Sequence, residues 1–166
     1  MSTTPIAASF ASGLSRRVFL TLSLSMAAAR AVQAKPVVPP RATSLRDALS
    51  HALQSGNPLL VLVSLEGCPF CRVARENYLE PLRAQGTPWV QVDMHVSTGL
   101  LDFDGKASTH EQLVRAWQVK TAPTVLFFGR EGRELAPRLV GGSLSDFYGA
   151  YLDERLAQAR AALKDG

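Results

Sequence analysis

The sequence contains only two cysteines and no apolar run long enough to span a membrane. A transmembrane helix needs about 20 consecutive apolar residues, whereas the apolar stretch near the N-terminus, Val18–Ala29, has about a dozen. The two cysteines, Cys68 and Cys71, stand three residues apart in the stretch EGCPFCRVAR. Such a pair can form a structural disulfide, half of a metal site, or a redox pair that opens and closes.

Basic charge is also scarce outside the first segment. Residues 1–34 contain Arg16, Arg17 and Arg30 and no acidic residue. Without them the chain keeps 15 basic residues against 14 acidic ones, so the net charge falls from +4 to +1. The remainder has no basic stripe, which argues against nucleic-acid binding. With 46% hydrophobic and 19% charged residues the composition is typical of a globular protein, and 166 residues fit one domain.

Residues 1–34 resemble a cleavable export signal. Arg16 and Arg17 precede the apolar stretch, and small residues then lead to Val32–Ala34, a cleavage site of the A-x-A type. Paired arginines before a modest apolar run resemble the bacterial twin-arginine signal, and an ordinary secretory signal is the alternative. In both cases we expect a mature chain that begins near Lys35, carries no cysteine there for a lipid, and is periplasmic with no stable membrane anchor.

The rest of the chain predicts a proline-rich extended linker over residues 35–43 and one α/β domain over residues 44–162. The apolar run Pro58–Leu65 is typical of a strand buried on both faces. Capping boxes are expected at Ser44 and Ser108, and turn chemistry at 97–107 predicts a loop. The expected helices span residues 44–54, from Cys68 to about 84, 108–117 and 145–162, and the expected strands span residues 58–65, 89–96, 124–128 and about 138–140.

The order of these elements predicts a central mixed β-sheet flanked by helices. The strand–helix–strand part implies parallel pairing through a right-handed crossover, and the later hairpin implies antiparallel pairing. Phe127 and Phe128 are expected to point to opposite faces of a covered strand.

Cys68 falls where the buried strand ends and a helix is expected to begin. Backbone N–H groups at a helix N-terminus favour a thiolate, so we expect the pKa of Cys68 to lie below that of a free thiol. Pro69 suits the first turn, because an N–H has no helical partner there. Cys71 lies one turn further in and is expected to be more buried. Cys68 is therefore the candidate attacking thiol, and Cys71 the candidate thiol that resolves the mixed disulfide.

Two other roles for the cysteines stay open. A zinc site would need two further ligands, and the candidates His51, His95 and His110 are scattered along the chain. A purely structural disulfide suits an oxidising compartment, although so small a loop would constrain little of the unfolded chain. The sequence favours the redox pair over both and predicts no metal.

A second motif follows about fifty residues after the cysteines. TAPT (Thr121–Thr124) puts a proline immediately before a strand, where proline is otherwise unfavourable. A CxxC pair after a buried strand, together with this proline, resembles the thioredoxin superfamily over residues 44–162. The resemblance implies a cis peptide bond between Ala122 and Pro123, with Pro123 packed beside the cysteines and nearby backbone pairing with substrate. A trans proline that opens a strand is the alternative.

DFDG (Asp102–Gly105) and the exported N-terminus resemble periplasmic thioredoxins associated with sulfur-oxidation systems, and thiol–disulfide interchange proteins more generally. Cytosolic thioredoxins carry a buried acid six residues before the first cysteine and a tryptophan just before it. Here these positions hold Leu62 and Gly67. Glu66 either takes part through water or is a solvated surface carboxylate. The departure puts thioredoxin-like proton handling in question, but not the exchange itself.

The two residues between the cysteines modulate the pair. Pro69 and Phe70 carry no charge, so neither adds a cation that would stabilise the Cys68 thiolate, whereas strongly oxidising relatives have a histidine there. We therefore expect a moderately lowered pKa, which favours a reductase or exchange role. Arg72 and Arg75 either add positive potential or line a solvated helix face.

Taken as a whole, these residues predict a periplasmic thiol–disulfide oxidoreductase. No dissociable cofactor is needed, because the dithiol carries the two electrons itself. The expected substrates are exported proteins or sulfur carriers with disulfides, and a membrane electron donor is expected to re-reduce the pair. The alternatives are a disulfide oxidase or isomerase of the same fold, or a non-catalytic binding, metal or iron–sulfur carrier module.

Overall fold

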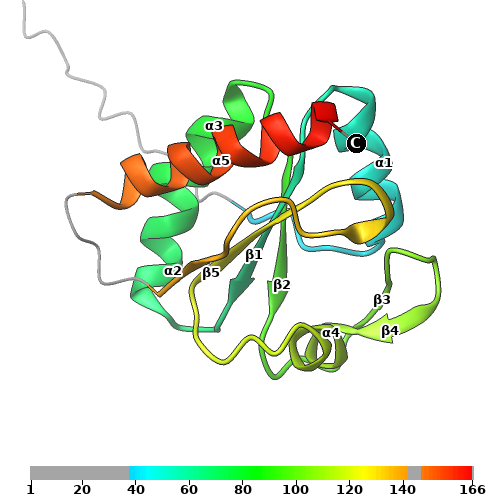
Figure 1. Ribbon diagram of the computed structural model, residues 1–166. Coiled ribbons are helices and arrows are strands. Elements are labelled where there is room, and N and C mark those ends of the chain that lie inside the picture. Colours follow the sequence, from blue (N-terminus) through cyan, green and yellow to red (C-terminus); the bar gives the residue numbers. More distant parts are fainter. Residues whose placement is uncertain (1–37, 142–146, 166) are drawn as a thin grey trace, which may run out of the picture. The chain divides into compact units, whose positions relative to one another are not determined.

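The structure is a computed structural model that describes residues 38–141 and 147–165 (Figure 1). The chain divides into two units, Met1–Lys35 and Pro36–Gly166, and all described residues belong to the second. The expected export signal and the expected helix start near Ser145 lie outside the described residues. Among the helices described, none has the length and apolar character needed to cross a membrane.

A four-stranded mixed sheet forms the centre of the domain. Its strands are β1 (Leu59–Ser64), β2 (Trp89–Asp93), β5 (Thr124–Phe128) and β6 (Leu139–Val140), in the order β2-β1-β5-β6. β1 runs parallel to β2 and antiparallel to β5, and β6 is antiparallel to β5. Every residue of β1 and β5 is buried, as their near-continuous apolar sequences predict. The predicted mixed sheet is confirmed.

Helices cover both faces of this sheet (Figure 1). α1 (Leu45–Gln54) and α4 (His110–Ala116) pack on one face. The other face is covered by α5 (Tyr148–Asp165) and by a continuous helical segment, α2 (Pro69–Val73), η1 (Ala74–Leu79) and α3 (Glu80–Ala84). η1 is a π-helix, and it ends two residues before Pro81, which has no N–H to donate to the preceding turn.

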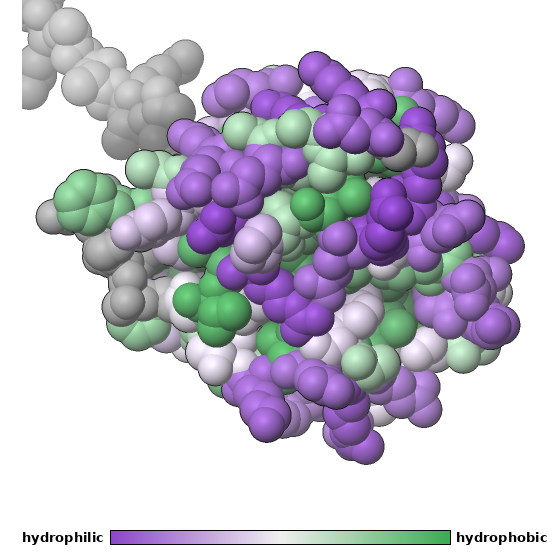
Figure 2. All heavy atoms as spheres, in the orientation of Figure 1, coloured by the Kyte–Doolittle hydropathy of each residue, from purple (hydrophilic) through white to green (hydrophobic). Residues whose placement is uncertain are grey.

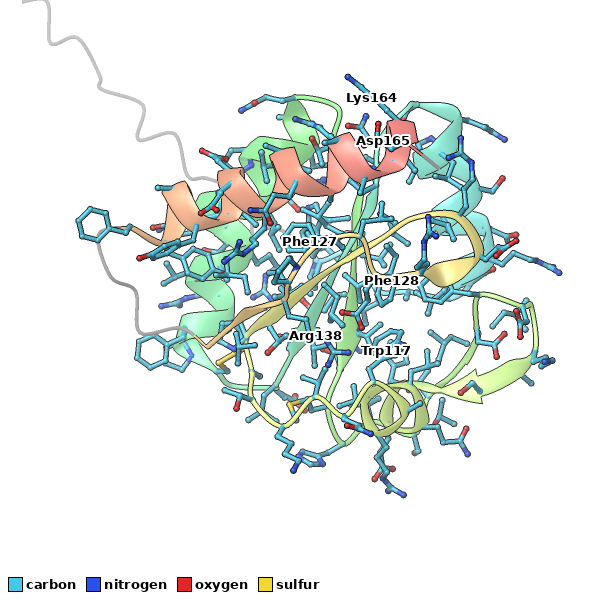
Figure 3. All side chains as sticks on the ribbon, in the orientation of Figure 1. Trp117, Phe127, Phe128, Arg138, Lys164 and Asp165 are labelled. Atoms are coloured by element: carbon cyan, nitrogen blue, oxygen red, sulfur yellow. A yellow bond between two sulfur atoms is a disulfide. The ribbon has the colours of Figure 1, made fainter. Side chains whose placement is uncertain are left out.

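Side-chain alternation divides the core into two layers. Phe127 packs on the α5 face, whereas Phe128 packs on the opposite face, as predicted (Figure 3). The ring of Trp117 lies 5.3 Å from that of Phe128, centroid to centroid. Figure 2 shows that hydrophilic side chains dominate the outside on the face drawn, with hydrophobic ones in small separate areas.

Three local predictions differ from the structure. Most of the loop expected over residues 97–107 belongs to a hairpin of β3 (Gly99–Leu101) and β4 (Ala107–Thr109), which extends two residues beyond that loop. Asp102 Oδ1 closes its turn by accepting hydrogen bonds from two backbone N–H groups. α4 is capped by Thr109 with Gln112, one residue later than the expected Ser108 box. β2 ends at Asp93, before the expected residue 96.

The last residues of the predicted linker are part of the fold. Gln91, on the outer edge of β2, donates its N–H to Pro40 O and accepts from Ala42 N, both at 2.9 Å. Ala42 is only 3% exposed and belongs to the core. This pairing carries Pro39 and Arg41 along the sheet edge towards the cysteines.

Leu126→Ala tests the buried centre of the sheet. Leu126 is fully buried in β5, so removing its side chain is expected to lower the free energy of unfolding by about 2 to 5 kcal/mol. Val140→Ala, on the 61% exposed Val140 of β6, is the control and should change it by about 0.5 kcal/mol or less. Urea unfolding measures both, and equal losses would contradict this account of the core.

Candidate active site

Cys68 and Cys71 form a disulfide at the junction between β1 and the helical segment. The chain leaves β1 at Ser64 and turns through Gly67, whose φ of +71° is unfavourable for residues with a side chain. Cys68 is the N-cap of α2, and its Sγ accepts a hydrogen bond from Cys71 N at 3.1 Å. The Cα atoms of the two cysteines are 5.3 Å apart, a normal disulfide separation.

The two sulfurs differ in their surroundings. Cys71 is 1% exposed, whereas Cys68 is half-buried and reaches the surface. Pro69 occupies the first helical turn, as predicted, and Phe70 is 50% exposed. An incoming sulfur can therefore reach Cys68 from solvent but not Cys71.

The peptide bond between Ala122 and Pro123 is cis, as the resemblance implies. Pro123 is buried at the start of β5, and the pairing of Val63 with Thr124 puts it beside the end of β1. Its carbonyl accepts from Gly141 N at 2.8 Å. Pro123 and the cysteines thus lie at the same end of two paired strands.

A cavity of about 400 Å³ opens beside the disulfide. Of the residues singled out in the sequence, Glu66, Cys68, Pro69 and Cys71 line it, together with Arg72 and Arg75. Phe70, Ala122 and Pro123 are not part of its lining. The structure therefore brings the cysteine motif and two arginines around one space and leaves the cis proline outside it.

A buried polar network forms the far wall of this cavity, and the sequence did not predict it. Asp93 is 4% exposed, and its Oδ1 accepts from Gln91 Nε2 at 2.5 Å. Its Oδ2 is 3.0 Å from Arg41 Nε, an ion-pair contact without hydrogen-bond geometry. Gln91 Oε1 accepts from Arg75 Nη1 at 2.9 Å. The available signal was the alternation of polar Gln91 and Asp93 at the end of a buried strand.

His110 contacts this network through the backbone of Asp93. It is 2% exposed, and its Nδ1 accepts from the backbone N–H of Asp93 at 3.0 Å. Burial lowers the pKa of His110, and the nearby Asp93 carboxylate opposes the shift without reversing it. His51 and His95 are exposed, and over residues 38–141 and 147–165 no three histidine, cysteine or acidic side chains group as metal ligands would.

His110 makes stability depend on pH. Because its folded pKa lies below the unfolded value of about 6.5, the unfolded chain takes up this proton first, and stability is lost as pH falls from that value towards the folded pKa. His110→Asn keeps an acceptor for Asp93 N but cannot titrate. We expect it to flatten the fall in unfolding free energy between about pH 7 and pH 5.

Urea unfolding at a series of pH values measures this effect. His51→Asn, which removes an exposed histidine from α1, is the control and should keep the wild-type slope. Identical slopes for the wild type and both variants would contradict the assignment.

The chain has matches among solved structures and among protein-family models. One of the matching solved structures is thioredoxin O2 from Arabidopsis thaliana in the oxidized state, with 19% identity over 70% of this chain and 91% of that chain and a TM-score of 0.45. Two others are a DsbH oxidoreductase (21% identity, 80% of this chain and 91% of that chain, TM-score 0.47) and Fasciola hepatica thioredoxin (17% identity, 72% of this chain and 98% of that chain, TM-score 0.48). No curated protein matches the chain. The family model described as a thioredoxin-like domain matches residues 45–155, more than half of the sequence. The chain therefore belongs to the thioredoxin-like domain family.

Proposed function

We propose that the protein is a periplasmic thiol–disulfide oxidoreductase that reduces or exchanges disulfides of exported proteins or sulfur carriers. The observation that carries the proposal is the Cys68–Cys71 disulfide at the start of the helical segment, with Cys68 accessible and Cys71 buried. This asymmetry assigns the two sulfurs different tasks in one exchange reaction.

The exchange proceeds in two steps, through a mixed disulfide between Cys68 and the substrate. In the reduced protein, the Cys68 thiolate attacks one sulfur of the substrate disulfide, the substrate S–S bond breaks, and one substrate thiolate leaves. Cys71 then loses its proton and attacks Cys68 Sγ, which breaks the mixed disulfide and releases the second substrate thiolate. The protein's two thiol groups are oxidised to the disulfide, and the substrate receives two electrons, the proton lost by Cys71 and one proton from solvent.

The local structure supports Cys68 as the attacking thiol. The N–H of Cys71 points at Cys68 Sγ, an arrangement that favours the thiolate and lowers the pKa of a cysteine. Pro69 and Phe70 add no cation, so we expect the pKa of Cys68 to be lowered only moderately. Such a pKa suits a reductase or exchange role. Glu66 lies on the wall of the same cavity and is exposed, where it modulates the local potential.

The family resemblance supplies the proposed role of the cis proline. Pro123 and Ala122 lie beside the end of β1, next to the turn that leads to Cys68, and the backbone there is proposed to pair with the substrate chain. Neither residue needs to line the cavity for this role, because backbone pairing takes place along the chain and not within a pocket.

The proposed partners follow from the chemistry, and the proposed location follows from the resemblance of residues 1–34 to an export signal. The periplasm oxidises such pairs, so a reductase there needs a membrane electron donor to restore the dithiol. No dissociable cofactor is proposed, because the electrons reside in the cysteines. The resemblance to periplasmic thioredoxins associated with sulfur-oxidation systems supports sulfur carriers as one substrate class.

Single cysteine variants test the division of roles. Cys71→Ser is expected to accumulate a covalent mixed disulfide through Cys68 with a disulfide-containing peptide, because the second step has lost its thiol. Cys68→Ser is expected to form little adduct, since its remaining thiol is 1% exposed in the native structure. Intact-mass spectrometry under non-reducing conditions measures both adducts. An adduct on neither variant, with a wild-type disulfide that resists exchange, would contradict the proposed function.

A further inference from the structure

The cavity beside the disulfide has a distinctive distribution of charge. Arg41, Arg72 and Arg75 line it together with the two acids Glu66 and Asp93. The charge of Arg41 is offset by Asp93, at 3.0 Å. Neither Arg72 nor Arg75 forms an ion pair with any of the described acidic side chains. Two arginines without an acidic partner among the described residues therefore line this space, against one exposed carboxylate, that of Glu66.

Arg75 is held in place without being neutralised. Gln91 uses its amide nitrogen to donate to Asp93, so its amide oxygen is left to accept from Arg75 Nη1. This neutral acceptor fixes the direction of the guanidinium and leaves its positive charge uncompensated. Arg75 Nε is also buried and has no hydrogen-bond partner. A guanidinium positioned in this way is complementary to an oxygen acceptor that carries negative charge.

Arg72 lies next to this position and nearer to solvent. It is four residues after Cys68 on the same helical segment, so it lies one turn from the attacking sulfur. Arg72 is exposed and Arg75 is half-buried, so the two arginines that line the cavity differ in their access to solvent. At about 400 Å³, the cavity has the size of a small-ligand site.

We propose that this cavity binds a carboxylate or other oxyanion that the substrate carries beside its reactive sulfur, with Arg75 and Arg72 as the residues that hold it. The inference rests on the proposed function, because it describes which disulfides Cys68 attacks fastest. The anionic group belongs either to a small disulfide or to an acidic side chain next to a cysteine in a protein. Its binding brings the neighbouring disulfide sulfur to Cys68.

A charge series of small disulfides tests the proposal. The pre-reduced protein is mixed with 3,3′-dithiodipropionate, 2-hydroxyethyl disulfide or cystamine, which carry two negative charges, no charge and two positive charges. The second-order rate constant of each is divided by that of the same disulfide with 2-mercaptoethanol, which cancels intrinsic reactivity. We expect the normalised rate constant of the anionic disulfide to exceed that of the neutral disulfide about fivefold to tenfold, as for one partly exposed charge-assisted contact. The cationic disulfide should have the lowest normalised rate constant.

Arginine variants identify the residues responsible. Arg75→Gln and Arg72→Gln are each expected to lower the anionic-to-neutral ratio at least about threefold, and Arg75→Lys to retain part of it. Arg83→Gln is the matched control, because it removes the same charge from the same helical segment at a residue that does not line this cavity. Arg83→Gln should keep the wild-type ratio. If Arg75→Gln does not fold, Arg72→Gln and Arg75→Lys still test the proposal.

Peptide disulfides with glutamate, glutamine or lysine beside the cysteine form a second arm. A preference for acid in this arm alone assigns the oxyanion to a protein side chain, and a preference in the small disulfides assigns it to a small molecule as well.

Equal normalised rates across charge in both arms would overturn the inference while leaving the proposed function intact. An equal loss of preference in Arg83→Gln would overturn it too, because it would show a response to net charge alone. Failure to react with any disulfide would overturn the proposed function and the inference with it.

Discussion

The position of the Cys68–Cys71 pair depends on the burial of β1. This strand lies between β2 and β5 with every residue buried, so the point at which the chain leaves the sheet is fixed. The turn through Gly67 then places Cys68 at the N-cap of α2, where its sulfur accepts a hydrogen bond from the backbone N–H of Cys71. The same packing hides Cys71 against the sheet. The difference in access between the two sulfurs is therefore a property of the fold rather than of the cysteine motif alone.

The polar wall of the cavity contains a buried carboxylate at a position that differs from that of cytosolic thioredoxins. At Leu62 the chain has an apolar residue where cytosolic thioredoxins carry a buried acid, and Leu62 pairs directly across the sheet with Gln91. The buried carboxylate lies instead at Asp93, on the neighbouring strand. It ties together Arg41 from the N-terminal segment and Gln91 from the sheet edge, so a segment whose composition indicates a linker becomes a wall of the site.

Much of the fold was predictable because strong local patterns coincide with tertiary burial. The apolar runs of β1 and β5 indicate central strands, and Ser44 does cap the first helix. The hairpin of β3 and β4 was missed because strands of three residues carry too little alternation to be distinguished from a loop. The start of α4 differs from the prediction because Ser108 and Thr109 are neighbouring residues that can both cap a helix. The backbone N–H of Gln112 donates to Thr109 Oγ1, which makes Thr109 the cap. Within the network around Asp93, only the alternation of Gln91 and Asp93 left a signal in the sequence. The contacts with Arg41, Arg75 and His110 were not predictable, because these residues come from distant segments that the fold brings together.

Cys68 and Cys71 are proposed to be a reversible redox pair that works mainly as a reductant or exchanger. The most direct test is the reduction potential of this pair, from equilibration with glutathione buffers and with Cys71→Ser as the control that cannot form the disulfide. We expect a reversible two-electron transition near the thioredoxin value of about −270 mV. A value near the about −120 mV of a strong oxidant would make the protein a disulfide donor and contradict the proposed direction. The absence of any reversible transition would contradict the redox role altogether.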